Sequence, residues 1–351
     1  MENQNQTPHK RRVRYKGKYP KKFEEKYKEF QPEKYKNTIE HVIQKGNTPA
    51  GMHISIMVKE IIDFLNIQPG EIGFDATLGY GGHTKAMLKC LNGKGHIYAT
   101  DVDPEESDKT KKRLADQGFG EDLLTVKLQN FCTIDEIAKE VGGFDFILAD
   151  LGVSSMQIDN PKRGFSFKVD GPLDLRLNQE AGISAAERLD TITRDELAGM
   201  LYENSDEPYC EELAKAITDE IRKGNRIDTT AKLRQVIEKT LDFLPEKEKK
   251  DTIKKTCQRT FQALRLDVNR EFEVLYEFME KLPDALRPGG RVAILTFHSG
   301  EDKLVKKALK EGYKAGIYSD YAKDVIRPSA QECAQNGRAR STKMRWAVKN
   351  K

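Results

Sequence analysis

The sequence has 351 residues, of which 33% are charged and 37% hydrophobic, and its formal net charge is +4. No apolar run approaches the roughly 18 to 20 residues that a membrane-spanning helix needs, and the polar, basic N-terminus lacks the apolar core of a secretory signal. The five cysteines are scattered without a C-x-x-C pair, which indicates reduced thiols and provides no metal-ligand spacing. We therefore expect a cytoplasmic protein with no metal site and no contact with a membrane.

Residues 1–48 have the composition of an appended basic arm. They hold 13 Lys and Arg against 6 Asp and Glu, a net charge of +7, so the rest of the chain sums to −3. Six aromatic residues are interleaved with these cations: Tyr15, Tyr19, Phe23, Tyr27, Phe30 and Tyr35. One interpretation is an RNA-binding arm, because cations attract a polyanion and rings stack on unpaired bases. The other is a solubilising tail, or an aromatic stripe that packs on the domain surface.

From about Met52 the pattern alternates between helix and strand. It predicts, in chain order, a helix over 53–65, a strand over 71–75, a helix over 84–91, a strand over 96–101, a helix over 105–117, a strand over 123–129, a helix over 133–141 and a strand over 144–151. Strands that alternate with helices indicate a parallel, doubly wound sheet. Residues 49–160 are thus expected to form the first part of an α/β domain.

The next clear strand, 291–297, begins 140 residues after Leu151. A crossover between parallel strands needs far fewer residues, about a dozen or more, so an insertion is expected over 161–283. Its pattern predicts helices over 194–202, 210–223, 230–241 and 269–282. Residues 284–351 are then expected to complete the α/β domain and end in a basic C-terminus, with six cations among the last fourteen residues.

A glycine-rich loop, D-A-T-L-G-Y-G-G-H, begins at Asp75, where the first predicted strand ends. In an open parallel sheet, ligands bind beyond the carboxyl ends of the strands. Gly79, Gly81 and Gly82 let backbone approach such a ligand closely. The second strand ends at Asp101, where a carboxylate typically accepts the hydroxyls of a ribose. The loop therefore predicts a site for an adenosine-like ligand; the alternative is a tight turn beside an ordinary surface carboxylate.

The absence of a dinucleotide-binding motif from the loop limits which nucleotide ligand it can bind. It does not have the G-x-G-x-x-G spacing of dinucleotide-binding folds, and Asp75 at its mouth would repel a phosphate. A carboxylate at this place suits a cationic ligand such as S-adenosylmethionine, whose amino group and sulfonium are both positive. The sequence thus favours a methyl donor over a dinucleotide.

The block D-L-G-V-S-S-M-Q-I-D leaves the fourth predicted strand at Asp150, where a methyltransferase presents its acceptor. Ser154, Ser155 and Gln157 supply hydrogen-bonding groups there. Acceptors placed on the hydrogens of an amine would raise its lone-pair density and receive the proton, and Asp150, Ser154 and Ser155 are the candidates for this role. Asp150 can instead serve only the methyl donor, and both interpretations stay open.

Cations and a histidine follow in later blocks. Arg163 and Arg176 lie in R-G-F-S-F-K-V-D-G-P-L-D-L-R and are suited to clamp phosphates, unless this is simply a polar loop. His298 leaves the fifth strand in F-H-S-G-E-D and is either structural or a proton relay. A dense cationic cluster precedes the expected final strand: Arg338, Arg340, Lys343 and Arg345.

Together these blocks resemble the bacterial 16S ribosomal RNA cytosine N4-methyltransferases of the RsmH (MraW) family. The resemblance covers about residues 50–351 and rests on four blocks in order: D-x-T-x-G-x-G-G-H, D-L-G-V-S-S-x-Q-x-D with R-G-F-S-F-x-x-D-G-P-L-D-x-R, R-T-F-Q-A-L-R and F-H-S-x-E-D. It implies a class I, Rossmann-like S-adenosylmethionine-dependent methyltransferase fold with an inserted helical domain. The implied reaction is methylation of the N4 exocyclic amine of one cytidine in the decoding region.

The resemblance also implies partners and site residues. The partner is 16S rRNA in the small ribosomal subunit or its assembly intermediate, and a homodimer is compatible with it. The family pattern places donor contacts on these residues: Gly81, Gly82, His83, Asp101, Phe131, Asp150 and Gln157. Arg259 and Arg265 of the R-T-F-Q-A-L-R block join the other cations as RNA-binding candidates. The chain departs from the pattern at Ala76, Gly300, Lys303 and Gly337, so a related methyltransferase acting on another amine in RNA, DNA or protein is the alternative.

Overall fold

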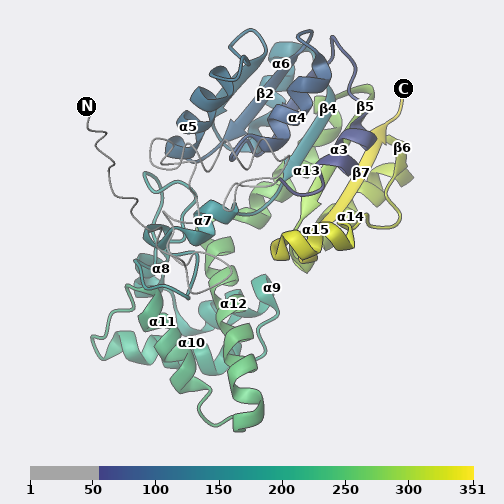
Figure 1. Ribbon diagram of the computed structural model, residues 1–351. Coiled ribbons are helices and arrows are strands. Elements are labelled where there is room, and N and C mark those ends of the chain that lie inside the picture. Colours follow the sequence, from purple (N-terminus) through teal and green to yellow (C-terminus); the bar gives the residue numbers. More distant parts are fainter. Residues whose placement is uncertain (1–54) are drawn as a thin grey trace, which may run out of the picture. The chain divides into compact units, whose positions relative to one another are not determined.

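The structure, a computed structural model, describes residues 55–351. The expected basic arm over residues 1–48 therefore lies outside the described residues, as does the start of the predicted helix 53–65. The described chain forms a seven-stranded sheet with helices on its faces. A group of further helices is inserted, along the sequence, between two of the strands (Figure 1). Within this part of the chain, no helix combines the length and apolar character needed to span a membrane.

The sheet has the strand order β3-β2-β1-β4-β5-β7-β6. The strands are β1 (Ile72–Asp75), β2 (His96–Asp101), β3 (Leu124–Leu128), β4 (Phe144–Asp150), β5 (Leu286–Thr296), β6 (Tyr318–Tyr321) and β7 (Lys343–Lys349). Strands β1 to β5 pair in parallel, whereas β7 runs antiparallel to both of its neighbours. The order reverses between β1 and β4, so the carboxyl ends of these two strands mark the place where such a sheet binds ligands.

Helices cover both faces of the sheet, because β4 and β5 are apolar on both sides. One face packs α3 (Val58–Leu65), α4 (Gly82–Leu91) and α5 (Pro104–Ala115), and the other packs α6 (Ile134–Val141), α13 (Glu271–Ala285) and α14 (Ser299–Lys314). Along β4, Phe146 and Leu148 face the first layer while Ile147 and Ala149 face the second. This near-continuous apolar run is typical of a parallel strand buried on both faces.

The α/β class predicted from the sequence is confirmed, and most element boundaries agree to within about two residues. The predicted helix 269–282 corresponds to α13 (Glu271–Ala285), and the main omission is the long helix that precedes it. The residues before it form α12 (Glu246–Asn269), which ends at Arg270 in a left-handed conformation with φ of 51°, and α13 begins one residue later. Helix α13 packs in the core of the sheet, so the inserted helices end with α12 rather than at residue 283. The strand β6 was not predicted.

The inserted helices have a hydrophobic core of their own. They are α7 (Ser155–Asp159), α8 (Ala185–Thr191), α9 (Arg194–Ser205), α10 (Cys210–Arg222), α11 (Thr230–Thr240) and α12. Their buried side chains form a cluster separate from the two clusters of the sheet; among its members are Leu197, Leu213, Ile217, Leu233 and Leu264. A cluster of this size explains why so long an insertion can fold between β4 and β5.

A buried ion pair joins the insertion to the sheet. Nη1 of Arg163 lies 2.6 Å from Oδ2 of Asp103, and the two residues are only 6% and 3% exposed. Asp103 also caps α5, and the other guanidinium nitrogen of Arg163 donates to the carbonyl of Leu177 at 2.6 Å. Both terminal nitrogens of the Arg163 guanidinium are thus engaged by protein groups, and the predicted contact of Arg163 with an RNA phosphate would have to displace them.

We expect Arg163→Ala to lower the free energy of unfolding by about 3 to 5 kcal/mol, because it leaves the Asp103 carboxylate buried without its partner. Chemical denaturation monitored by circular dichroism measures this loss. The matched control is Arg340→Ala, since Arg340 is exposed and its loss should stay within about 0.5 kcal/mol. If both variants lost the same free energy of unfolding, the buried ion pair would contribute no more to stability than an exposed arginine does.

Candidate active site

Asp75 lies beneath the glycine-rich loop rather than at its mouth. The residue is 1% exposed, its Oδ2 accepts a hydrogen bond from Oγ1 of Thr84 at 2.6 Å, and its Oδ1 accepts one from the amide of Thr77 at 3.1 Å. Burial raises the pKa of Asp75 above its ordinary value. Asp75 thus connects the end of β1 to the first turn of α4 and shapes the loop, while its predicted contact with a ligand stays a prediction.

The glycines of the loop make room for the protein's own atoms. Gly81 has a φ of 73°, and a Cβ there would lie 2.7 Å from Cγ2 of Thr110. A Cβ on Gly82 would lie 1.9 Å from Oγ of Ser55. The amide of Gly79 donates to Oδ2 of Asp101 at 2.8 Å. The loop therefore needs glycine for its packing against α5 and the 55–57 segment, in addition to any approach of a ligand.

Asp101 ends β2 with a carboxylate that is suited to a ribose. Its Oδ2 accepts from the Gly79 amide and its Oδ1 accepts from the Asp103 amide at 2.9 Å. A carboxylate oxygen has a second lone pair, so each oxygen can still accept a hydroxyl. Burial raises the pKa of Asp101 to about 6. Two accepting oxygens held at one strand end fit the paired hydroxyls of a ribose.

His83 and Asp150 form the next link at the carboxyl edge. Nε2 of His83 lies 2.8 Å from the carbonyl oxygen of Ile56, and Nδ1 lies 3.4 Å from Oδ2 of Asp150. Burial alone would lower the pKa of His83, but the Asp150 carboxylate and the Ile56 carbonyl outweigh it and raise the pKa. Because both ring nitrogens face acceptors, the surroundings of His83 favour its cationic form.

One oxygen of Asp150 has no hydrogen-bond partner among the described residues. The atom Oδ1 is buried, and no hydrogen-bond donor reaches it among residues 55–351. Buried polar atoms of this kind call for an explanation, and a bound group is one. Asp150 ends β4 next to the point where the strand order reverses, which is the region where such a sheet binds ligands. It is suited to accept a hydrogen from an amino group.

Ser154 and Gln157 are occupied by the short helix α7. Oγ of Ser154 accepts from the amide of Gln157 at 3.2 Å, and Oε1 of Gln157 accepts from the amide of Ser154 at 2.9 Å, which is a capping box. Nε2 of Gln157 lies 3.3 Å from Oδ2 of Asp103. Ser155 is the first residue of α7 and is half-buried. Of the two serines proposed as proton acceptors, only Ser154 already has its oxygen engaged as a cap.

His298 reaches the same edge at the end of β5, as the N-cap of α14. Its Nε2 lies 3.1 Å from Oε1 of Glu301, whose other oxygen accepts from the amide of Phe297 at 2.8 Å. Glu301 is 3% exposed and was not identified as a site residue from the sequence. Its spacing of three residues from the helix cap, in F-H-S-G-E-D, is the capping-box signal that could have found it.

Gly300 and Phe272 fit together beside His298. The ring of Phe272 meets the imidazole of His298 edge-on, with 5.7 Å between the ring centroids. A Cβ on Gly300 would lie 2.6 Å from the Phe272 ring. The glycine at 300, where the chain departs from the family pattern, therefore leaves space for an aromatic ring at the rim of the site.

Some of the predicted donor residues contact one another, or a neighbour, near the carboxyl ends of the strands. Hydrogen bonds or short contacts connect Gly79 to Asp101, His83 to Asp150, and Gln157 to Asp103. Phe131 lies after β3 and packs edge-on against Phe278 of α13 at 5.2 Å. The paired acceptors of Asp101 and the free oxygen of Asp150 fit a nucleoside that carries a cationic group.

Most of the predicted RNA-binding cations are paired with carboxylates of the protein. These pairs are Arg163–Asp103, Arg176–Asp174, Arg259–Glu207, Arg265–Glu271, Arg338–Asp159 and Lys343–Asp302. Arg345 is 4% exposed and also pairs with Asp302. Arg340 is exposed, and no carboxylate of the described chain pairs with it. The cluster predicted near the C-terminus is thus largely neutralised. Arg265 and Arg176 each form a bidentate ion pair within the protein, and an RNA phosphate would have to compete with that pair.

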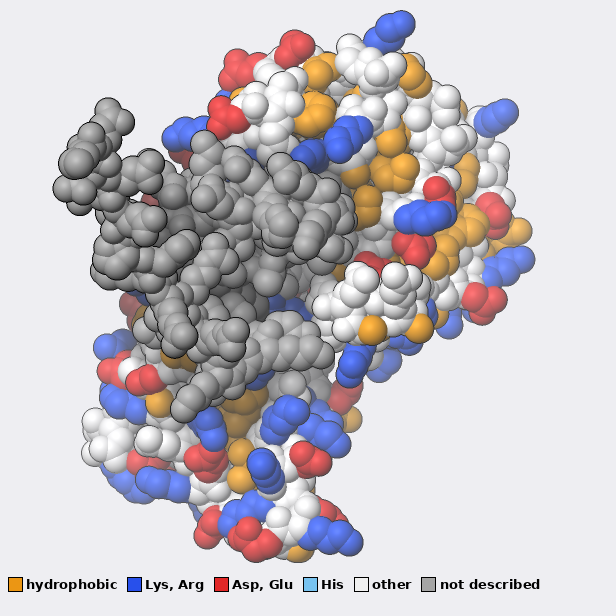
Figure 2. All heavy atoms as spheres, in the orientation of Figure 1, with side chains coloured by type: hydrophobic (Ala, Val, Ile, Leu, Met, Phe, Trp, Pro, Cys, Tyr) orange, Lys and Arg blue, Asp and Glu red, His pale blue; other side chains and the backbone are white. Residues whose placement is uncertain are grey.

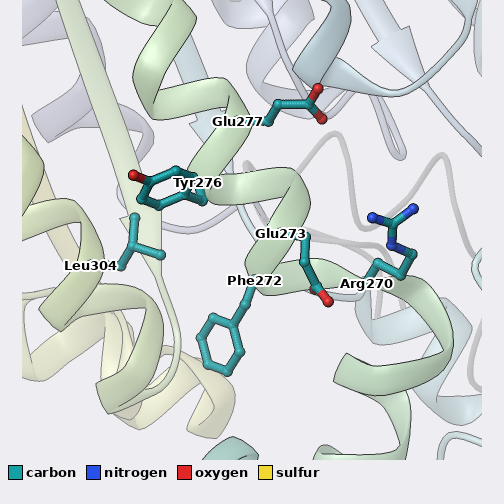
Figure 3. Close-up of a pocket in the computed structure, with 6 residues that line it drawn as sticks. All are labelled: Arg270, Phe272, Glu273, Tyr276, Glu277 and Leu304. Atoms are coloured by element: carbon teal, nitrogen blue, oxygen red, sulfur yellow. The ribbon is translucent and has the colours of Figure 1, made fainter.

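A pocket of about 490 Å³ lies between α13 and α14. It is lined by Arg270, Phe272, Glu273, Tyr276, Glu277 and Leu304 (Figure 3). In Figure 3 the ring of Tyr276 lies beside Leu304, and Phe272 stands one turn earlier on the same helix. Across the described residues, no group of three or more His, Cys, Asp or Glu side chains could hold a metal ion.

Comparison with known proteins identifies the family. The family model described as the MraW methylase family matches residues 50–350. The ribosomal RNA small subunit methyltransferase H 1 of Agathobacter rectalis is 87% identical over 97% of this chain and 98% of that protein. The protein of the same name from Lachnoclostridium phytofermentans is 69% identical over 99% of this chain and 95% of that protein.

More distant proteins were also found. The ribosomal RNA small subunit methyltransferase H of Acidobacterium capsulatum is 36% identical over 85% of this chain and 98% of that protein. A solved rRNA methylase from Streptococcus thermophilus covers 86% of this chain and 100% of its own with a TM-score of 0.38 at 15% identity, a likeness too low to add to the assignment. The family match and the similar relatives decide the assignment: this chain belongs to the MraW methylase family.

Proposed function

We propose that this protein uses S-adenosylmethionine to methylate the N4 exocyclic amine of a cytidine in the decoding region of 16S rRNA. The observation that carries the proposal is Oδ1 of Asp150 at the end of β4, which is buried and has no hydrogen-bond partner among residues 55–351. Relatives named ribosomal RNA small subunit methyltransferase support the substrate class. The substrate would be met in the cytoplasm, in the small ribosomal subunit or its assembly intermediate.

The donor would be held at the ends of β1 and β2. Asp101 would accept the two ribose hydroxyls, while Gly81, Gly82 and His83 would contribute the start of α4. Phe131 and Gln157 complete the set that the family pattern predicts. When bound, S-adenosylmethionine supplies a methyl group that is already electrophilic, so the chain need not activate it further.

The chain's own task is to align the amine and receive its proton. The lone pair of the N4 amine is conjugated into the ring, so an acceptor on its hydrogens raises its nucleophilicity. Asp150 is the proposed acceptor, with Ser155 at the start of α7 and His298 as a relay paired with Glu301. Holding amine and methyl group in line can contribute up to roughly 7 to 11 kcal/mol of the rate enhancement.

A second candidate is a methyltransferase of the same family with a shifted target, on another amine in RNA, DNA or protein. The relatives numbered 1 or 2 in their names align over 97 to 99% of this chain, whereas the Acidobacterium capsulatum protein, which has no number, aligns over 85%. The longer alignments include most of the basic arm that precedes the family match. An added basic segment is a reasonable means of directing a related enzyme to a different site.

Mapping of modified nucleosides separates these candidates. Mass spectrometry of rRNA from cells with and without the gene should show loss of one N4-methylcytidine in the decoding region when the gene is removed. In vitro, the purified protein should methylate small ribosomal subunits in preference to naked rRNA and DNA. Unchanged rRNA together with methylation of DNA or protein would replace the proposed substrate with the second candidate.

The pKa of Asp101 makes donor binding depend on pH. Ribose hydroxyls donate to the ionised carboxylate, so we expect affinity for S-adenosylmethionine to rise as the pH rises through about 6 and then to level off. At pH 5 the binding should be about tenfold weaker than at pH 8. Calorimetric titration across this range measures the effect, and Asp101→Asn should bind weakly with no such dependence. If Asp101→Asn kept the wild-type pH profile of donor binding, Asp101 would not be the residue that binds the ribose.

Replacing Asp150 by Asn keeps the shape of the side chain but removes its charge. We expect the single-turnover rate of methyl transfer to fall by at least roughly a hundredfold, within the range of acid–base contributions. Donor affinity measured on the same variant distinguishes a proton acceptor, which leaves it nearly unchanged, from a donor contact, which does not. Asp116→Asn, at an exposed position after α5, is the control. A wild-type rate in Asp150→Asn would exclude both roles.

A further inference from the structure

Helix α14 presents a row of lysines on the side opposite its buried face. Val305 and Leu309 pack into the core of the sheet, while four lysines point away from it at spacings of three or four residues: Lys303, Lys307, Lys310 and Lys314. All four are exposed, and we call them the lysine ridge. Residues at this spacing lie on one face of a helix, about one turn apart.

The lysine ridge is not neutralised by carboxylates of the described chain, whereas several lysines of other helices are. In α3, α5, α6 and α11, lysines pair with a carboxylate one turn earlier or later, as in Lys59–Asp63, Lys109–Glu105, Lys139–Asp135 and Lys232–Asp228. Within residues 55–351, no ion pair is made by the ammonium groups of the lysine ridge, although Glu311 is exposed on the same helix. Like charges one turn apart destabilise a helix slightly, so this row is maintained against a small cost in stability.

Helix α12 provides a contrast of similar length. Its exposed residues include Lys250, Lys254 and Lys255, but Glu248 and Asp251 are interspersed among them. In Figure 2, basic and acidic side chains alternate over the part of the molecule where Figure 1 labels α10 to α12. A surface of mixed sign is what a merely soluble helix needs, whereas a row of one sign attracts a polyanion.

The position of the lysine ridge relates it to the candidate active site. His298 at the rim of the site is the N-cap of α14, so the ridge leads away from that rim. From Lys303 to Lys314 it extends for about 16 Å, since a helix rises 1.5 Å per residue, and this length spans several phosphates of a nucleic-acid strand. Lys303 and Lys307 are on the helical turn that carries Leu304, which lines the pocket between α13 and α14.

The pocket beside the lysine ridge suits a base rather than a phosphate. It offers the rings of Phe272 and Tyr276, the latter 58% exposed, and bases of single-stranded RNA stack on such rings. Glu273 and Glu277 also line it and would repel a phosphate, but a carboxylate can accept a hydrogen from the amino group of a base. Rings in the pocket and cations on the ridge therefore match the two sides of one RNA strand.

We propose that the lysine ridge and the pocket between α13 and α14 bind the single-stranded RNA that flanks the acceptor nucleotide, with its phosphates on the ridge and one base against Tyr276. The proposal rests on the proposed function for the identity of the acceptor. It assigns to α14 the contact with the RNA backbone that the sequence suggested for the paired arginines. The RNA is recognised here by stacking and charge rather than by its sequence.

The test is a charge reversal on the lysine ridge, Lys307→Glu with Lys310→Glu, and a matched reversal on α12, Lys254→Glu with Lys255→Glu. Both variants change the net charge equally. We expect only the ridge variant to weaken binding of a short labelled single-stranded RNA, by about tenfold in fluorescence anisotropy. Its slope of log affinity against log salt concentration should fall by about 1.4, because each phosphate of a single strand that a cation neutralises contributes about 0.7 and the variant removes two such cations. Affinity for S-adenosylmethionine should stay unchanged in both.

The pocket is tested separately with Tyr276→Ala and Tyr276→Phe. Stacking requires the ring but not its hydroxyl, so Tyr276→Ala should weaken RNA binding about tenfold while Tyr276→Phe retains it.

The KM for small ribosomal subunits should rise in the ridge variant with little change in kcat, because the ridge does not contact the reacting atoms.

Several results would overturn the proposal. Equal weakening by the α12 and α14 reversals would show an effect of net charge alone. Unchanged RNA binding in the ridge variant would exclude the ridge, and weaker binding to subunits with normal binding to the labelled RNA would indicate an acidic protein as the partner. Because anisotropy needs no catalysis, ridge-dependent RNA binding without methylation of a cytidine would refute the proposed function and leave this proposal standing.

Discussion

The buried ion pair between Arg163 and Asp103 is the contact on which the arrangement of the site depends. Asp103, two residues after Asp101, caps α5. Its carboxylate also accepts a hydrogen bond from the side chain of Gln157, which follows β4. The guanidinium of Arg163 also donates a hydrogen bond to the carbonyl of Leu177. The amide of Leu177 in turn donates to Oδ1 of Asn269 at the end of α12. The donor end of β2, the acceptor loop after β4 and the last inserted helix are therefore connected through one guanidinium. Because this pair is almost fully buried, water does not compete for it.

Features that depend on local pattern were predictable from the sequence. The apolar runs of β1, β2 and β4 end in Asp75, Asp101 and Asp150, and the parallel topology brings those ends to one edge of the sheet. The long helix α12 was missed because charged residues crowd its first half, where apolar positions are too sparse to show a helical period. The left-handed Arg270 that separates α12 from α13 has no sequence signal, since glycine or asparagine usually takes such a position.

The cations show most clearly where reasoning from the sequence stops. Counting charges identifies a basic cluster near the C-terminus, but it does not show which charges are already paired. Arg338 meets Asp159 across 179 residues of sequence, and Lys343 meets Asp302 across 41. Such partners come from the tertiary fold, so a cluster that looks available in sequence is partly used for structure. The lysines of α14 attract less notice in the sequence, yet within residues 55–351 Lys303, Lys307, Lys310 and Lys314 are exposed and make no ion pair.

The insertion between β4 and β5 has a consequence for the order of folding. Strands β1 to β4 follow one another along the chain, whereas β5 pairs with β4 only after the inserted helices and α13, as in the pair Asp150 and Leu295. Loop-closure entropy grows slowly, by about 0.6 kcal/mol for each doubling of length, so the insertion costs little at equilibrium. Pairing between residues so distant in sequence is nevertheless slow. We therefore expect β1 to β4 to gain protection in pulsed hydrogen exchange before β5, so that the half of the sheet that carries Asp101 forms earlier than the half that delivers His298.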